Sequence, residues 1–68
     1  MMSKLHEEPE WIFPFQDMHV GDSFFIPTLN PEAMIVAMQG GAKRLKIKVR
    51  TYITLKNNHI GVRCWRIL

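Results

Sequence analysis

Acidic residues are missing from the second half of this 68-residue sequence. All six acids lie at or before Glu32, whereas eight of the nine bases lie at or after Lys43. With one lysine and six acids, residues 1–32 carry a net charge of −5, and residues 33–68 carry +8. This asymmetry predicts an electropositive face, which favours a polyanionic partner. The alternative is that the two halves fold against each other, so that their charges offset.

Cysteine and histidine are too scarce and too dispersed to build a metal site. Cys64 is the only cysteine, which excludes an intramolecular disulfide and a cysteine-rich zinc site. The histidines, His6, His19 and His59, have no partner at ligand spacing. No histidine or acid lies near Cys64 in sequence, so we interpret it as a small core residue. We therefore expect no cofactor, no metal and no enzymatic activity.

Long apolar runs are also missing. No stretch of about 20 apolar residues could span a membrane, and residues 1–10 are polar and acidic, unlike a signal peptide. These absences predict a soluble, cytoplasmic protein with no membrane partner. The length indicates one domain with a thin core and little room for a buried active-site cavity. We expect a flexible N-terminal arm over residues 1–10 and a single domain over residues 11–68.

The first half of that domain shows local signals for an extended segment, a strand and a helix. Residues 10–15 are apolar and contain Pro14, which predicts an extended lead-in. Residues 23–27 predict a short strand. Asn30 can cap a helix that begins with Pro31. An apolar stripe at helical spacing follows, made by Met34, Met38, Ala42 and Leu45. The pair Gly40-Gly41 either ends this helix or lets it lie close to the sheet.

The second half of the domain predicts a β-hairpin. Apolar and polar residues alternate from Arg44 to Leu55, as in a half-buried strand. Residues 56–59 predict a turn, and residues 60–67 predict the return strand. The sequence therefore predicts a small α+β domain of β-α-β-β order, with a three-stranded, mainly antiparallel sheet and one helix packed on one face.

Basic and aromatic residues gather on this predicted hairpin. On one pleat face, Arg44, Lys46, Lys48 and Arg50 would form a row of cations about 7 Å apart, twice the strand rise, which is close to the spacing of phosphates along a nucleic-acid strand. Basic sheets with interleaved aromatics bind phosphates and stack bases. The candidate nucleic-acid-binding residues are Lys43, Arg44, Lys46, Lys48, Arg50, Tyr52, Arg63, Trp65 and Arg66. The alternative is an ordinary solvated face, and Trp65 taken alone is more typical of a core residue.

Two motifs resemble a family of small uncharacterised phage and prophage proteins. One is Phe13-Pro14-Phe15-Gln16-Asp17-Met18-His19-Val20-Gly21-Asp22-Ser23-Phe24-Phe25-Ile26-Pro27, and the other is Gly61-Val62-Arg63-Cys64-Trp65-Arg66-Ile67. The helix of that family is expected to be rich in alanine and arginine, whereas this one has no base before Lys43. The departure disfavours a charged helix that reads a DNA groove. The resemblance implies a phage context and a location in the cytoplasm of the host cell.

Two functions fit these observations. The first is a non-enzymatic, phage-type nucleic-acid-binding or transcription-regulatory protein that uses the basic sheet face, with DNA the favoured ligand. The second is a phage protein that binds a host protein such as RNA polymerase through an apolar, acidic N-terminal segment containing Glu7, Glu8, Glu10, Trp11, Phe13 and Phe15. Either function is compatible with a monomer or with a homodimer formed through an exposed sheet edge.

Overall fold

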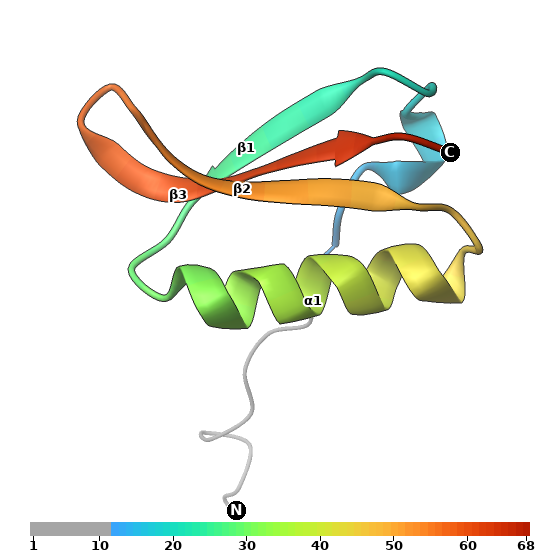
Figure 1. Cartoon of the computed structure of the whole chain (residues 1–68), viewed down its shortest axis with the longest axis horizontal. Helices are drawn as coiled ribbons and strands as arrows, with labels where there is room; N and C mark the ends of the chain where they lie inside the picture. The colour runs from blue at the N-terminus through green and yellow to red at the C-terminus, as the bar shows by residue number, and fades with distance from the viewer. Residues whose placement is uncertain (1–11) are drawn as a thin grey trace, which may run out of the picture.

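A three-stranded antiparallel sheet lies against one long helix in the computed structural model, which describes residues 12–68 (Figure 1). The elements in chain order are the 3-10 helix η2 (Phe15–Asp17), β1 (Ser23–Pro27), α1 (Pro31–Arg44), β2 (Val49–Lys56) and β3 (His59–Arg66). The strand order is β1-β3-β2, and both pairings are antiparallel. This confirms the predicted α+β class and the β-α-β-β order. Within the described residues, no helix is long and apolar enough to cross a membrane.

The start of α1 follows the local signals in the sequence. The Asn30 side chain accepts a hydrogen bond from the Ala33 N–H at 3.3 Å, and Pro31 occupies the first turn, where its missing N–H costs nothing. Strand β1 also spans the five residues that its composition predicts. The predictions for these two elements are confirmed.

The end of α1 differs from the prediction. The helix continues through Gly40 and Gly41 to Arg44, and β2 begins only at Val49, so the strand predicted from Arg44 is wrong over its first five residues. Lys46 takes a left-handed conformation with φ 61°. Its N–H donates to the Lys43 carbonyl at 3.0 Å, and the Ile47 N–H donates to the Ala42 carbonyl at 3.1 Å. These two bonds form a Schellman motif, which ends the helix.

Gly41 leaves room for the N-terminal lead-in to pack against α1. A Cβ at Gly41 would lie 3.0 Å from Cε2 of Phe15, whereas a Cβ at Gly40 would meet nothing within 4 Å. Gly41 therefore lets the helix lie close to the Phe15 ring, which neither interpretation of the glycine pair anticipated. Phe15 itself begins η2, so the predicted extended lead-in is wrong at that residue.

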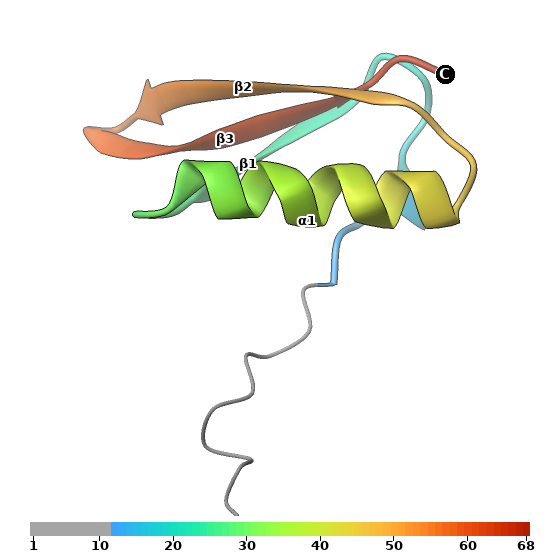
Figure 2. The ribbon, with the colours of Figure 1, turned by 60° about the horizontal axis from the view of Figure 1, so that its bottom comes forward.

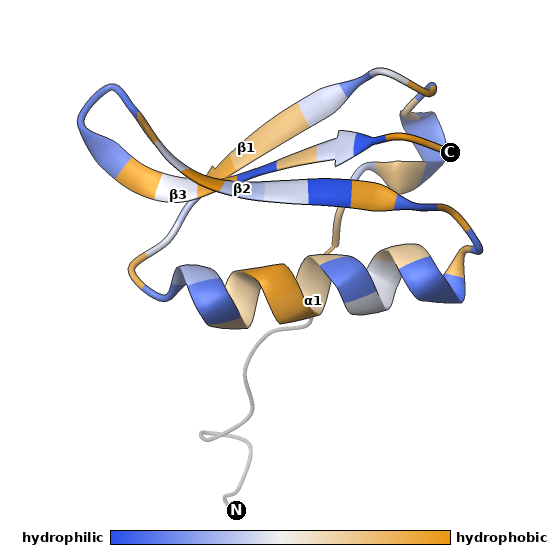
Figure 3. Cartoon of the chain, in the orientation of Figure 1, coloured by the Kyte–Doolittle hydropathy of each residue, from blue (hydrophilic) through white to orange (hydrophobic). Residues whose placement is uncertain are grey.

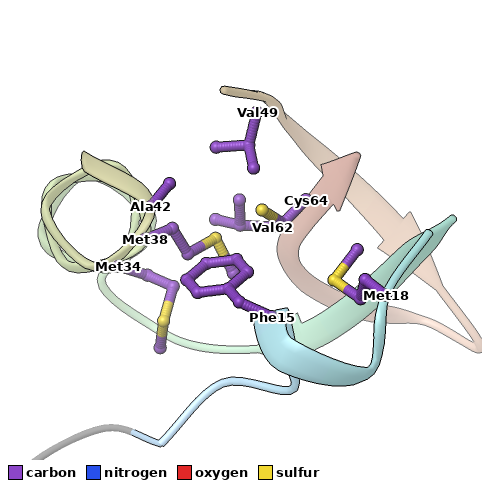
Figure 4. Packing of buried hydrophobic residues seen from close by; sticks show 8 residues of the cluster. All are labelled: Phe15, Met18, Met34, Met38, Ala42, Val49, Val62 and Cys64. Carbon is purple, nitrogen blue, oxygen red and sulfur yellow. The ribbon is translucent and has the colours of Figure 1, made fainter. Parts of the chain in front are cut away.

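The core lies between α1 and the inner face of the sheet (Figure 4). Met38 and Ala42 of the helix point toward Val62 and Cys64 of β3, whereas the buried side chain of Met34 turns away from these two residues. The other buried members of the cluster are Phe15, Met18 and Val49. Cys64 is fully buried, as predicted for a core residue, whereas Leu45, the last member of the predicted helical stripe, is exposed.

Strands β2 and β3 form the expected hairpin. Asn57 and Asn58 both have positive φ, 53° and 66°, as a two-residue type I′ turn requires. Strand β3 occupies 59–66 rather than the predicted 60–67. The turn end of this hairpin extends beyond the first turn of α1 in both views of the ribbon (Figures 1 and 2).

Candidate nucleic-acid interface

One face of the sheet is covered by α1, and no element of residues 12–68 packs on the other (Figure 2). Cross-strand partners point to the same side of a sheet, so the register assigns each residue to a face. Along β2 and β3, hydrophilic residues (blue) and hydrophobic residues (orange) both occur, because neighbouring residues of a strand point to opposite faces (Figure 3). We call the uncovered side the open face. It is made by Ser23, Phe25, Pro27, Arg50, Tyr52, Thr54, Lys56, His59, Gly61, Arg63 and Trp65.

Arginines and aromatic rings alternate across the open face. Trp65 on the central strand lies between Ser23 and Arg50, and in the next row Arg63 lies between Phe25 and Tyr52. The register thus brings together four of the predicted site residues. Trp65 and Tyr52 are 43% and 47% exposed. The interpretation of Trp65 as a core residue is therefore wrong, because its ring lies on the solvent side of the sheet.

Two cationic side chains, Arg63 and Lys56, lie over the ring of Phe25. The Arg63 guanidinium carbon lies 5.8 Å from the centroid of the Phe25 ring, and the Lys56 Nζ lies 5.9 Å from it. Both distances allow cation–π attraction. Nη1 of Arg63 also donates a hydrogen bond to Oγ of Ser23 at 3.0 Å. The Arg63 side chain is therefore held in one position on the face.

The sequence interpretation missed several members of this face. Phe25, Lys56, Ser23 and His59 were absent from the predicted site. Ser23 and Phe25 join the face because β1 pairs with β3 rather than with β2, which no local pattern in the sequence shows. Lys56 and His59 lie opposite each other in the hairpin, so the hairpin register alone would have placed them.

The open face carries no acid. The acids of residues 12–68 are Asp17 in η2, Asp22 before β1 and Glu32 in α1. Among these residues the only ion-pair contact joins His19 Nδ1 to Asp22 at 3.6 Å, and the Asp22 carboxylate also accepts a hydrogen bond from the His19 N–H at 2.9 Å. Asp22 therefore stabilises its turn. Within the described part of the chain, no acid offsets the charge of the sheet.

Four of the predicted cations lie elsewhere. Lys43 and Arg44 belong to the last turn of α1, and Lys46 and Lys48 lie in the connection to β2. The predicted row from Arg44 to Arg50 is therefore wrong, because Lys46 interrupts the alternation with its left-handed backbone. Lys43, Lys46 and Lys48 instead line a groove of about 650 Å³, whose apolar lining includes Ile47, Val49, Ile67 and Leu68.

Arg66 has a structural role. It lies opposite Val49 on the side of the sheet that α1 covers. Its Nη1 donates to the Met18 carbonyl at 2.6 Å, and its Nε donates to the Leu68 carbonyl at 3.2 Å. The side chain ties the segment after η2 to the C-terminal residues, so the predicted position of Arg66 on the same face as Arg63 and Trp65 is wrong.

Two aromatic residues of the alternative protein-binding segment, Phe13 and Phe15, lie within the described residues, and both pack against the domain. Phe15 is buried in the core, and Phe13 is partly buried against it, with ring centroids 5.4 Å apart. Phe13 also stacks on Phe24 at 5.9 Å. Phe15 is therefore enclosed by the fold, whereas Phe13 stays partly exposed. The other residues of that prediction, Glu7, Glu8, Glu10 and Trp11, lie outside the described residues, as does His6.

Catalytic groups do not gather in the part of the chain that the structure describes. Residues 12–68 contain no cluster of three or more metal-ligating side chains. Burial raises the pKa of the Cys64 thiol from 9.0 to about 11, which keeps it protonated and unreactive at neutral pH.

The buried thiol gives a prediction about reactivity. At pH 8 we expect the chromogenic disulfide reagent DTNB to react with Cys64 at least about 100-fold more slowly in buffer than in 6 M urea, because burial suppresses both access and the thiolate. The absorbance of released thionitrobenzoate measures both rates. Equal rates with and without urea would contradict the buried position.

The same pKa shift gives a dependence of stability on pH. The unfolded thiol ionises from about pH 9, whereas the folded thiol stays protonated to about pH 11. The unfolded state therefore binds fewer protons in this window, so the free energy of unfolding should fall as the pH rises from about 9 to about 11. Urea titrations at pH 8 and pH 10 measure the fall. The Cys64→Ala variant is the control, and it should show a smaller fall.

Comparisons with models of protein families, with curated proteins and with solved structures found no match to this chain.

Proposed function

We propose that this protein binds nucleic acid through the open face and acts without enzymatic chemistry, as a DNA-binding or transcription-regulatory protein of the phage type. The observation that carries the proposal is the composition of that face. Arg50, Lys56 and Arg63 alternate with three aromatic rings, and no acid lies among them. Solvated sheet faces commonly mix charges of both signs, so a face of one sign with exposed rings favours a polyanionic ligand.

The cations and the aromatic rings of the open face make different contacts with the nucleic acid. The guanidinium and ammonium groups neutralise phosphates and release the counterions condensed on the nucleic acid. Because Arg63 is already held by Ser23 and by the Phe25 ring, it loses little side-chain entropy on binding. The exposed rings of Tyr52 and Trp65 are suited to stack on bases or to pack against sugars.

The shape of the hairpin favours double-stranded DNA. The major groove of B-DNA admits a two-stranded β-ribbon, and the turn end of the β2–β3 hairpin extends beyond α1 (Figures 1 and 2). This end carries Lys56, Asn57, Asn58 and His59, all exposed. Their side chains supply donors and acceptors that can reach phosphates and base edges.

A salt titration of two matched double variants tests the proposal. In Arg50→Gln/Lys56→Gln, two open-face charges are removed. If each contacts one phosphate, the slope of log K against log salt should fall by about 1.8, and affinity at 0.1 M salt should fall between about 10-fold and 100-fold. Fluorescence anisotropy with a labelled 20-bp duplex and a 20-nucleotide single strand, at 50 to 200 mM salt, measures both quantities.

Lys43→Gln/Lys46→Gln is the control, because it removes the same charge from the groove beside α1. It should leave the slope within about 0.5 of the wild-type value, since only long-range attraction is lost. An equal loss in both variants would show that binding does not use the open face. Absence of binding by the wild type at 50 mM salt to either ligand would contradict the function itself.

A further inference from the structure

The two edges of the sheet are not equivalent. Strand β1 is short and ends in Pro27, which has no N–H to offer another strand. Strand β2 is eight residues long and contains no proline. Short strands and prolines protect sheet edges from pairing with other chains. Only β1 has this protection, so β2 is the edge available to a further strand.

The hydrogen-bond pattern shows which backbone N–H and C=O groups of β2 point away from β3 and could bond to a further strand. The Lys48 N–H donates to the Leu68 carbonyl at 3.2 Å, and the Lys48 carbonyl accepts from the Ile67 N–H at 2.9 Å, so Lys48 faces β3. Backbone groups of alternate residues point the same way in an antiparallel pair. The even-numbered residues of β2 therefore bond to β3. The backbone groups of four residues face outward, namely Val49, Thr51, Ile53 and Leu55.

Apolar side chains border this edge on both sides of the sheet. Ile53 and Leu55, on the same side as α1, are 51% and 68% exposed. Tyr52 is half-exposed on the open face. The edge thus combines unpaired backbone groups with exposed apolar surface, and a partner strand of similar composition would cover both.

We propose that β2 pairs with β2 of a second copy of this chain, antiparallel, about a two-fold axis that passes between the two Tyr52 residues. In this register Thr51 faces Ile53 of the second copy, and Val49 faces its Leu55. Tyr52 faces Tyr52 as a non-hydrogen-bonded pair, the arrangement in which side chains lie closest. In this register the tyrosine pair and the Val49–Leu55 pair bring apolar side chains together, and each contact occurs twice, as a two-fold interface requires.

Charge disfavours the register centred on Ile53. Pairing about Ile53 would set Arg50 directly opposite Lys56 of the second copy, and like charges in that position are destabilising. Pairing about Tyr52 sets Arg50 opposite Thr54 instead. Lys48 would then come opposite Lys56, but Lys48 precedes the strand and lines the groove beside α1. The result is one six-stranded sheet with two open faces side by side.

Cysteine cross-linking tests both the dimer and its register. In Tyr52→Cys the two new thiols would lie on Cα atoms about 4.5 Å apart, within the range that a disulfide spans. We expect a covalent dimer on non-reducing gels after mild oxidation at 50 µM protein. In Arg50→Cys the two Cα atoms would lie about 13 Å apart along the strands, so this variant should stay monomeric on the gel. The native Cys64 is buried and does not compete.

Three results would overturn the proposal. One is faster cross-linking of Ile53→Cys than of Tyr52→Cys, which would show the neighbouring register. Another is equal cross-linking of Tyr52→Cys and Arg50→Cys, which would indicate random collision. The last is a wild-type protein that sediments as a monomer at every concentration from 10 to 500 µM. None of these results depends on nucleic acid, so the dimer and the proposed function fail separately.

Discussion

The Gly61→Ala variant is expected to lose about 2–4 kcal/mol of its free energy of unfolding, because the added methyl group has no room. A Cβ at Gly61 would collide with the backbone carbonyl of Ile26. It would also lie 2.7 Å from Cζ of Phe25 and 2.7 Å from Cα of Pro27. Two of these three atoms are backbone atoms of β1, so the clash can be relieved only by parting β1 from the central strand.

A loss of this size approaches the whole stability of a domain this small, about 3–5 kcal/mol. Thermal unfolding followed by circular dichroism should show a melting temperature far below that of the wild type, or no transition. Gly40→Ala is the matched control, since a Cβ there meets nothing within 4 Å. In a helix interior that change should stabilise the protein by about 0.5–1 kcal/mol. Equal melting temperatures for Gly61→Ala and the wild type would refute the close contact.

Truncation of Met38 to alanine is expected to cost about 2–5 kcal/mol, the range for emptying a fully buried site. Met38 is 0% exposed and lies at the centre of the cluster between α1 and β3 (Figure 4). Most of its neighbours are held by the helix or the sheet, so the cavity cannot close easily. Urea unfolding monitored by far-UV circular dichroism measures the loss as a lower midpoint with an unchanged slope.

Val36→Ala provides the comparison within the same helix. Val36 is 73% exposed on the solvent side of α1, and its truncation should change the free energy of unfolding by no more than about 0.5 kcal/mol. If both variants unfolded at the same urea concentration, the assignment of the Met38 side chain to the core would be wrong.

The elements that were predicted correctly have short-range causes. The Asn30 cap, the proline in the first turn of α1 and the paired asparagines of the hairpin turn each act within four residues. Local sequence therefore contains all of the information that these features need. The same holds for the alternation from Val49 onward, which placed Arg50 and Tyr52 on one face correctly.

The end of α1 could not be predicted because its usual signal is misplaced. A glycine at the position after the C-cap normally marks a Schellman motif, yet here Lys46 takes the left-handed conformation. Gly40 and Gly41 look like the stop signal, but they lie inside the helix. Gly41 is explained by the ring of Phe15, a contact between segments that are far apart in the sequence.

The candidate site was only half predictable for the same reason. Hairpin register is local, so Arg63 and Trp65 could be set beside Tyr52 and Arg50. The position of Phe25 depends on the pairing of β1 with β3, which no local pattern encodes. Arg66 was assigned to the interface because nothing near it in sequence reveals that its side chain bonds to the Met18 carbonyl.

The strand order sets a constraint on how this chain acquires its structure during synthesis. Strand β3 lies between the other two, yet it follows both of them in the chain and leaves the ribosome after them. Until residues 59–66 emerge, β1 and β2 have no strand to pair with, and the methionines of α1 have no sheet to cover. The nascent chain therefore exposes the apolar residues of β1, α1 and β2 until β3 has left the ribosome, and the sheet can form only then.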